Sequence, residues 1–231
     1  VRALAFSDVP GDDPGVIGSG LLVPDPRLQA GLQALDLPAW LAQPLQQGLD
    51  ERVPFVGQAP EMEIVANLGR ARQAAADRAI SLGYRVRREE RFIDGDAAER
   101  GRELAGSLLR GEPGVAIWGG ETTVRLPASP GRGGRNQHLA LAAAQVLAGR
   151  DDVWFLAAGT DGTDGPTADA GALVDGGTLQ RARAEGFDPQ RSLERADAGR
   201  LLEATGDLLT TGPTGTNVMD LMIGLKAEAL P

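Results

Sequence analysis

The chain is most informative when read outward from one segment, Gly119-Gly120-Glu121-Thr122-Thr123-Val124, continued by Pro130-Gly131-Arg132-Gly133-Gly134-Arg135-Asn136-Gln137. An apolar run from Val115 to Trp118 precedes it and has the composition of a buried strand. This strand delivers two glycines and the carboxylate of Glu121 at its C-terminal end. Open α/β sheets gather their active sites at that end of the strands.

The second half of the segment predicts a loop followed by a helix. Residues 127–134 are rich in Gly and Pro, and Asn136 opens an Ala- and Leu-rich helix that we expect to end near Ala148. Arg132, Gly133, Gly134 and Arg135 then lie at a helix N-terminus, where free N–H groups, the helix dipole and guanidinium groups favour an anion such as phosphate. The alternative is a Gly-rich connection with two solvated arginines.

A second polar loop follows another apolar strand, expected from Val153 to Ala158. It contains Asp161, Asp164 and Asp169, spaced by Gly and Thr. Carboxylates in a loop after a strand suit a hard cation that takes oxygen ligands and keeps waters. The alternative is a set of Asx turns that use Asp for local hydrogen bonds. Together the two loops favour phosphate and Mg²⁺ chemistry.

Two further loops carry polar groups. A strand expected from Ala3 to Phe6 leads into residues 7–14, which include Asp8 and Asp12, and the length of this loop suggests that it lines a site. The alternative is a surface loop stiffened by proline. The loop 209–217 offers hydroxyl and amide groups, among them Thr216, that could orient a substrate.

Composition limits the classes of partner. The chain has 231 residues, 42% of them hydrophobic, and a net charge of −9. The negative charge argues against nucleic acid or an anionic membrane as the main partner. Its basic residues are arginines apart from Lys226, it lacks cysteine, and its longest apolar stretch, residues 139–148, is too short to span a bilayer. We expect a cytoplasmic location.

The predicted elements alternate between strands and helices from residue 61 onward: strands at 61–66 and 84–93, and helices at 68–82 and 96–109 with Asp96 as a cap. This order predicts an α/β fold with a largely parallel βαβ sheet and helices on both faces. Prolines in 51–60 place a boundary there, so residues 1–60 are expected to be a partial second α/β domain and residues 61–231 the main domain. Helical spacing is also present at 27–35 and 39–49. Because the chain opens in a strand without Met, we expect an N-terminal portion to be missing.

Standard nucleotide and nucleophile motifs do not match. The loop 131–136 places Asn136 where a dinucleotide fingerprint needs its third glycine, and no G-x-x-x-x-G-K-[ST] or G-x-S-x-G sequence occurs. His138 is the single histidine and falls in the first turn of the expected helix. A general base is one interpretation, and a solvated histidine is the other.

Four collinear segments resemble one family. Taken together, residues 119–124, 131–137, 160–167 and 211–217 resemble the class II glycerate 2-kinases, whose C-terminal module is called MOFRL, and residues 7–14 with 23–26 resemble the late part of that family's N-terminal domain. The resemblance implies Mg²⁺-assisted phosphorylation of D-glycerate by ATP, in a cleft between two α/β domains. The family's longer N-terminal domain supplies a catalytic lysine and much of the nucleotide site, so we expect this chain alone to be inactive.

We assign roles on this basis as hypotheses. Arg135 clamps the carboxylate of glycerate or the migrating phosphoryl group, and Gly133 and Gly134 lend backbone N–H groups. Asp161 and Asp164 hold Mg²⁺, or one of them accepts the substrate proton. Glu121 orients Arg135 or the metal shell. The remaining candidates for substrate contact are Asn136, Thr216, Asp8 and Asp12.

Two rival functions remain open. Members of this family are often labelled hydroxypyruvate reductases, and an NAD(P)H-dependent reductase would require nicotinamide binding, for which the fingerprint is absent. A non-catalytic anion-binding module is favoured if the chain lacks an N-terminal part. A homodimer is a further expectation, although no sequence feature fixes the oligomeric state.

Overall fold

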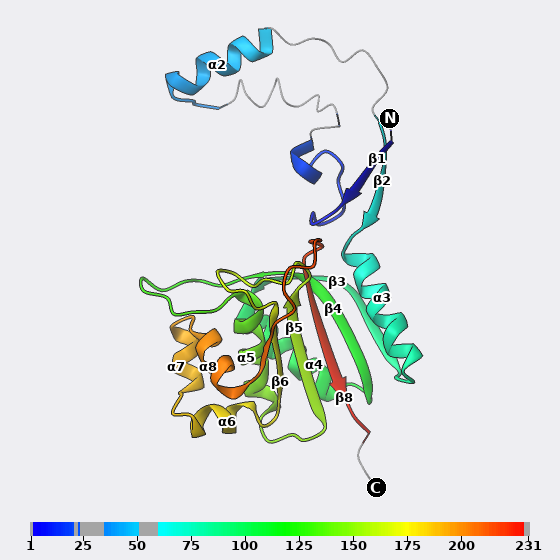
Figure 1. Ribbon diagram of the computed structural model, residues 1–231, viewed down its shortest axis with the longest axis vertical. Helices are drawn as coiled ribbons and strands as arrows, with labels where there is room; N and C mark the ends of the chain where they lie inside the picture. Colours follow the sequence, from blue (N-terminus) through cyan, green and yellow to red (C-terminus); the bar gives the residue numbers. More distant parts are fainter. Residues whose placement is uncertain (1, 21–22, 24–34, 51–59, 229–231) are drawn as a thin grey trace. The chain divides into compact units, whose positions relative to one another are not determined.

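The structure is a computed structural model that describes residues 2–20, 23, 35–50 and 60–228. Its strands are β1 (Arg2–Phe6), β2 (Glu61–Ala66), β3 (Val86–Asp96), β4 (Gly114–Thr123), β5 (Val153–Gly159), β6 (Gly171–Asp175), β7 (Leu208–Leu209) and β8 (Asp220–Lys226). Its helices are η1 (Ile17–Gly20, a 3-10 turn), α2 (Ala39–Asp50), α3 (Leu68–Ser81), α4 (Ala97–Arg110), α5 (Arg135–Leu147), α6 (Thr178–Ala184), α7 (Pro189–Glu194) and α8 (Ala198–Thr205). Figure 1 shows these elements along the chain.

Two compact units make up the chain. One comprises Val1–Ala5 and Gly11–Val65, and the other comprises Phe6–Pro10 and Ala66–Pro231. The expected domain boundary at residues 60/61 stays a prediction, and residues 6–10 group with the second unit although they lie far from it in sequence.

In the first unit, β1 and β2 form a two-stranded sheet, so the strand at 61–66 pairs with the N-terminal strand and does not join the main sheet. The helix expected at 39–49 is α2, whereas residues 27–34 lie outside the described part of the chain.

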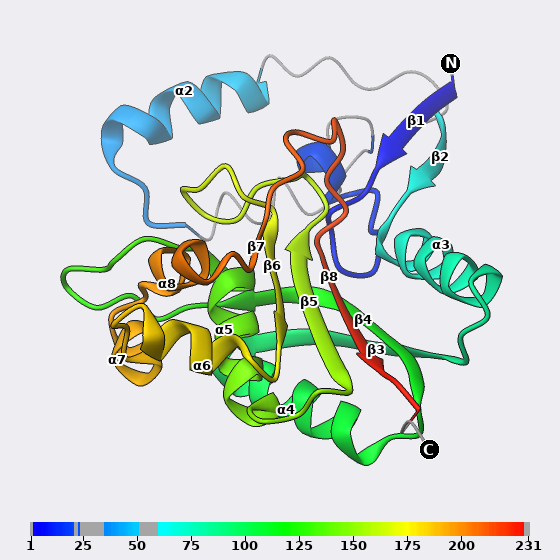
Figure 2. The ribbon, with the colours of Figure 1, turned by 60° about the horizontal axis from the view of Figure 1, so that its bottom comes forward.

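The second unit contains a six-stranded sheet with the order β3-β4-β8-β5-β6-β7. The α/β class is confirmed, with one correction to the strand pairing. Only β3 and β4 pair in parallel, and the other neighbouring pairs are antiparallel. Two features cause this: β5 and β6 are joined by the acidic loop without a crossover helix, and β8 enters between β4 and β5 in the opposite direction (Figure 2).

Helices cover both faces of this sheet, as expected. On one face α3 packs through Ala76 and Ala79 against Val115 and Ile117. On the other face α4 and α5 form the main core with the sheet, which includes Leu104, Leu139, Phe155 and Met222. Trp118 and Phe155 pack against each other in this core, with ring centroids 6.1 Å apart. Among the described residues, no helix has the length and apolar character that crossing a membrane requires.

Local sequence explains where the helices begin. Asn67 and Asp96 cap α3 and α4 by accepting the N–H groups of Arg70 and Glu99. The predicted cap at Asp96 is therefore confirmed. In contrast, α5 begins after Gly134, which has no side chain to cap it.

The close contact between α4 and α5 depends on Gly101. A Cβ at this position would lie 2.2 Å from the carbonyl oxygen of Leu139 on α5. Such a distance is far below van der Waals contact, so a larger residue would force the two helices apart.

We expect Gly101→Ala to destabilise the protein by about 1–3 kcal/mol or more, because overpacking strains a core that cannot yield at a backbone atom. Gly106→Ala in the same helix is the matched control. Its Cβ would meet only the end of the flexible Arg110 side chain, so helix propensity should make it neutral or stabilising by up to about 1 kcal/mol. Chemical denaturation of both variants measures the difference, and equal stabilities would contradict this account of helix packing.

Candidate functional site

The N-terminus of α5 is capped from a distant loop. The Asp164 carboxylate accepts the backbone N–H of Asn136 at 3.0 Å through Oδ1 and that of Gln137 at 2.8 Å through Oδ2. Gly134 makes this approach possible, because a Cβ there would lie 2.3 Å from Cγ of Asp164. Asp164 therefore fastens the acidic loop to the first turn of α5 and satisfies two N–H groups that a helix leaves free.

Burial makes Asp164 an unusual carboxyl group. Its exposure is 2%, and desolvation by burial raises its pKa to about 6, against the opposing effect of the N–H groups that it accepts. The neighbouring charge of Asp220 raises this pKa further. Asp164 thus titrates much closer to neutral pH than an exposed aspartate does.

Arg135 is held by two carboxylates at the start of α5. Asp220 accepts its Nε–H at 2.6 Å and its Nη2–H at 3.1 Å, and Glu121 forms an ion pair with Nη1 at 3.0 Å. The hydrogen bonds to Asp220 raise the pKa of the Arg135 guanidinium above its usual value, so it is always charged. The Arg135 side chain remains 37% exposed and can still meet a ligand.

The geometry of the sheet brings Asp161 to the same place. Asp220 is the first residue of β8 and pairs with Gly120 of β4 on one side and Gly159 of β5 on the other. A Cβ on Gly159 would lie 2.9 Å from Oδ1 of Asp161 and 3.6 Å from Oδ1 of Asp220. Arg135, Asp220 and Asp161 therefore gather around the ends of β4, β5 and β8.

A cavity of about 360 Å³ opens beside Arg135. Its size lies at the lower end of the range for small-molecule sites, about 300–1,000 Å³. Its lining includes both polar and apolar groups: Thr122, Thr123, Gly133, Gly134, Arg135 and His138, together with Val124, Leu126, Pro166, Ala196 and Ala198.

His138 lies in this lining, but it is not solvated as one interpretation held. Its exposure is 8%, its Nδ1 is buried without a hydrogen-bond partner in the described structure, and burial lowers its pKa. The imidazole is therefore neutral at pH 7.

The other expected site residues lie in several places. Gly133, Gly134 and Asn136 lie at the start of α5 beside Arg135, and Asp8 accepts a long hydrogen bond of 3.5 Å from Nδ2 of Asn217, one residue beyond Thr216. The hydroxyl of Thr216 is buried and lacks a hydrogen-bond partner among the described residues. Asp12 belongs to the first unit. Arg132, expected near the anion, pairs instead with Glu203 of α8 at 2.8 Å.

The acidic loop offers few free metal ligands. Both oxygens of Asp164 accept N–H groups of α5, whereas Asp161 makes only local hydrogen bonds, accepting the N–H and the hydroxyl of Thr163. Within the described ranges, no group of three or more His, Cys, Asp or Glu side chains could by itself hold a metal ion. The donor set fits a Mg²⁺ ion that keeps waters and takes one or two carboxylates in addition to substrate phosphates, which is how Mg²⁺ is usually bound.

Sequence reasoning missed Asp220, the main partner of Arg135. One signal was available, since Asp220 is the single charged residue within the apolar segment 218–225. A carboxylate in a buried strand requires a partner, and no other residue type satisfies it as well as arginine. The sequence does not show, however, that β8 lies between β4 and β5.

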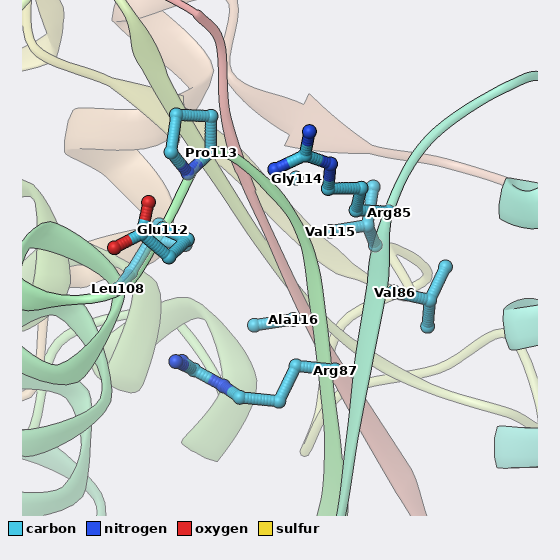
Figure 3. A pocket seen from close by; sticks show the side chains of 9 residues that line it. All are labelled: Arg85, Val86, Arg87, Leu108, Glu112, Pro113, Gly114, Val115 and Ala116. Atoms are coloured by element: carbon cyan, nitrogen blue, oxygen red, sulfur yellow. The ribbon is translucent and has the colours of Figure 1, made fainter.

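A second hollow lies at the opposite end of β4, where the strand begins at Gly114 (Figure 3). It measures about 250 Å³, and its charged lining residues are Arg85, Arg87 and Glu112. Arg87 already contacts the Trp118 ring, 5.9 Å from its centroid, and donates to Ser107. The end of the sheet that carries Arg135 is the better candidate because two carboxylates, a guanidinium and the N-terminus of α5 converge there beside a cavity.

The fold defines an α/β protein with a mixed six-stranded sheet. Its site consists of the guanidinium of Arg135, held by two carboxylates, at the edge of the sheet where α5 begins. Comparison with known proteins gives a family for this arrangement. Residues 114–220 match the MOFRL family. The chain is 38% identical to a D-glycerate 2-kinase of Thermotoga maritima over 97% of its own length and 56% of that protein. It is also 33% identical to a glycerate 2-kinase of Pyrococcus horikoshii.

A solved structure agrees with these sequence matches. The crystal structure of a glycerate kinase from Thermotoga maritima matches with a TM-score of 0.88 and 36% identity, over 98% of this chain and 57% of that one. An Agrobacterium vitis protein that is 40% identical over 94% of this chain and 53% of its own length is labelled a hydroxypyruvate reductase. The chain spans about half the length of the curated relatives that it matches.

Residues 114–220 thus match the MOFRL family, and the chain is similar to proteins named glycerate 2-kinase over nearly all of its own length. The resemblance inferred from four short motifs is confirmed.

Replacing Asp164 by Ala should destabilise the protein by about 1–3 kcal/mol at pH 7.5, because two N–H groups of α5 lose a buried acceptor. The cost should grow at lower pH. Since the folded state holds the Asp164 proton more tightly than the unfolded chain does, this group contributes stability below its unfolded pKa and loses it as the pH rises toward 6. We therefore expect the cost to be larger by about 2 kcal/mol at pH 4.5.

Denaturant unfolding of wild type and Asp164→Ala at both pH values measures this difference. Asp188→Ala, which removes an exposed cap of α7, is the control for the loss of a helix cap alone. If the loss of stability in Asp164→Ala becomes smaller at low pH, the folded state favours the carboxylate form of Asp164. That result would contradict the claim that burial raises the pKa of Asp164.

Proposed function

We propose that this chain contributes the substrate-phosphorylating site of an ATP-dependent glycerate 2-kinase. The observation that carries the proposal is the anchored Arg135, exposed beside a cavity and flanked by Asp161 at the end of the sheet. Phosphoryl transfer asks a protein mainly to position the reactants and to stabilise charge, and this arrangement supplies both. Homology to proteins named glycerate 2-kinase supports glycerate as the acceptor.

Arg135 is the proposed contact to the anion. Of its five N–H groups, two are bonded to Asp220 and one faces Glu121, which leaves two donors for a ligand. Guanidinium N–H groups are strong donors to the oxygens of a carboxylate or a phosphoryl group. Gly133 and Gly134 line the same cavity and have no side chains of their own that would obstruct a bulky anion.

In the proposed reaction, a hydroxyl oxygen of D-glycerate attacks the γ-phosphorus of ATP. The new O–P bond forms as the bond from the γ-phosphorus to the bridging oxygen of ADP breaks, and the hydroxyl proton leaves to a carboxylate or to water. If Asp161 does not hold the metal ion, it is the proposed acceptor of that proton, because it lies at the site and makes only local hydrogen bonds. Asp164 is a poorer candidate because it is 2% exposed and both of its oxygens accept backbone N–H groups of α5.

A Mg²⁺ ion bound with ATP would neutralise charge on the β- and γ-phosphates. Asp161 is the carboxylate of this chain that we propose to hold it, directly or through water, with Glu121 at the edge of the same site. Asn136, Thr216, Asp8 and Asp12 remain proposed substrate contacts.

A reductase is the competing function, since one relative carries that label. It would require nicotinamide binding, and the loop 131–136 lacks the dinucleotide fingerprint. Following NADH absorbance with hydroxypyruvate, and ADP release with D-glycerate and ATP, separates the two functions in one experiment. Oxidation of NADH without ADP release would overturn the kinase proposal, and anion binding with neither reaction would favour a non-catalytic module.

We expect Arg135→Ala to lower kcat/KM for D-glycerate phosphorylation by about two orders of magnitude, as for the loss of a transition-state charge contact. The measurement is ADP release by the full-length enzyme. Arg183→Ala, an exposed arginine on α6, is the control and should behave like wild type. Normal activity of Arg135→Ala would remove this residue from the proposed mechanism.

Asp161→Asn tests the carboxylate that we propose for the cation. If Asp161 holds Mg²⁺, the concentration of Mg²⁺ needed for half-maximal activity should rise by about tenfold or more. The readout is a Mg²⁺ titration of ADP release at saturating ATP. If kcat falls and the Mg²⁺ requirement stays the same, Asp161 acts on the substrate proton instead of the metal.

A further inference from the structure

Met219, the residue before Asp220, has a backbone conformation that its side chain disfavours. Its φ is +71°, in the left-handed region, where Cβ crowds the backbone. It is also 4% exposed, so the conformation is enclosed in the protein interior. A strained residue of this kind persists only where surrounding groups hold it.

Thr160 and Asn217 supply those groups. The carbonyl oxygen of Met219 accepts both the backbone N–H of Thr160 at 3.0 Å and its hydroxyl at 2.7 Å. The same hydroxyl oxygen accepts the N–H of Val218 at 2.8 Å, and Oδ1 of Asn217 accepts the N–H of Met219 at 3.0 Å. The Thr160 hydroxyl therefore bonds to the backbone before and after the strained φ angle of Met219, at the N–H of Val218 and the carbonyl oxygen of Met219.

This fixed turn sets the direction of the next side chain. Asp220 enters β8 between Gly120 and Gly159, where neither neighbour has a side chain to support its carboxylate. Both Asp220 oxygens nevertheless point to Arg135. The side chain of Asp220 is 1% exposed, so water does not compete for it.

We propose that Asp220 is the positioning residue of Arg135, and that the Thr160 hydroxyl holds Asp220 in place through the strained backbone of Met219. The kinetic consequences of this inference rest on the proposed kinase function, whereas the arrangement itself does not. Thr160, Met219 and Asp220 act through Arg135 and make no contact with substrate in this scheme.

The charges around Arg135 indicate what this positioning achieves. Asp220 and Glu121 together carry more negative charge than the guanidinium carries positive charge. The site therefore gains little attraction for an anion from Arg135. What it gains is a guanidinium whose orientation is fixed before the substrate arrives, which lowers the cost of organising the transition state.

The arrangement can be tested without activity. In ¹⁵N-labelled protein, the Nε–H signal of Arg135 is identified by its disappearance in Arg135→Lys. A short, buried hydrogen bond to Asp220 should protect this proton from exchange with water. We expect exchange to become at least tenfold faster in Asp220→Asn and in Thr160→Val, while Thr160→Ser, which restores the hydroxyl, restores protection.

Thr178→Val is the matched control for a lost buried hydroxyl. Thr178, the first residue of α6, is fully buried, and its hydroxyl accepts the N–H of Asp175. This variant should therefore lose stability without changing the Arg135 signal. If Thr160→Val does not fold, Asp220→Asn still tests the central pair. Unchanged protection in Asp220→Asn would overturn the inference.

Kinetics of the full-length enzyme test the functional part. We expect Asp220→Asn to lower kcat for D-glycerate phosphorylation at least tenfold without raising KM for D-glycerate, because removing a carboxylate leaves more net positive charge to attract the anion. A merely structural role would reduce the amount of folded enzyme and leave kcat per folded molecule unchanged, and that result would overturn positioning. If wild-type enzyme forms no ADP with D-glycerate while the exchange results hold, the proposed function fails and the arrangement stands.

Discussion

The contact between Arg135 and Asp220 is the interaction on which the site depends. It joins the first residue of α5 to the first residue of β8, two elements separated by 85 positions in the sequence. A buried carboxylate without a partner is costly, and so is an arginine whose hydrogen bonds are unsatisfied. The pair is therefore possible only where β8 lies between β4 and β5 and α5 begins beside their ends. The Arg135–Asp220 pair therefore ties the order of the strands, the start of α5 and the geometry of the site to one another.

Glycines make this convergence possible. A Cβ would lie 2.0 Å from the carbonyl oxygen of Ile93 at Gly120 and 2.3 Å from Cγ of Asp164 at Gly134. At Gly159 it would lie 2.5 Å from the carbonyl oxygen of Thr163, in the loop that follows. These positions require glycine because of close approach, whatever their backbone angles. Gly134 lets the Asp164 carboxylate reach the start of α5, and Gly159 lets two acidic side chains meet above the strand end. These loops are rich in glycine because several segments of the chain must pack into the same small volume.

The sequence predicts the parts of this structure that depend on local patterns. The helix from Asn136 and the cap at Asp96 follow from composition and spacing, and so does the strand at 153–158. Pairing of strands is not local. The pairing of β5 with β6 follows from the connection between them, and the insertion of β8 depends on contacts with strands 60 or more residues earlier. The alternation of strands and helices favoured parallel pairs instead.

The same limit applies to the site. An Asp-Gly-Thr loop has the same appearance whether its carboxylates bind a cation or cap a helix, because the distinguishing partner lies elsewhere. Asp164 finds that partner in the N–H groups of α5, nearly 30 residues earlier, while Asp161 bonds only within its own loop. Each free carboxylate at this edge adds negative charge around a guanidinium that Asp220 and Glu121 already offset. Under the proposed function, the Mg²⁺ ion carried by ATP would offset this excess of negative charge. The proposed function thus pairs the anchored arginine with a nucleotide that brings its own metal ion.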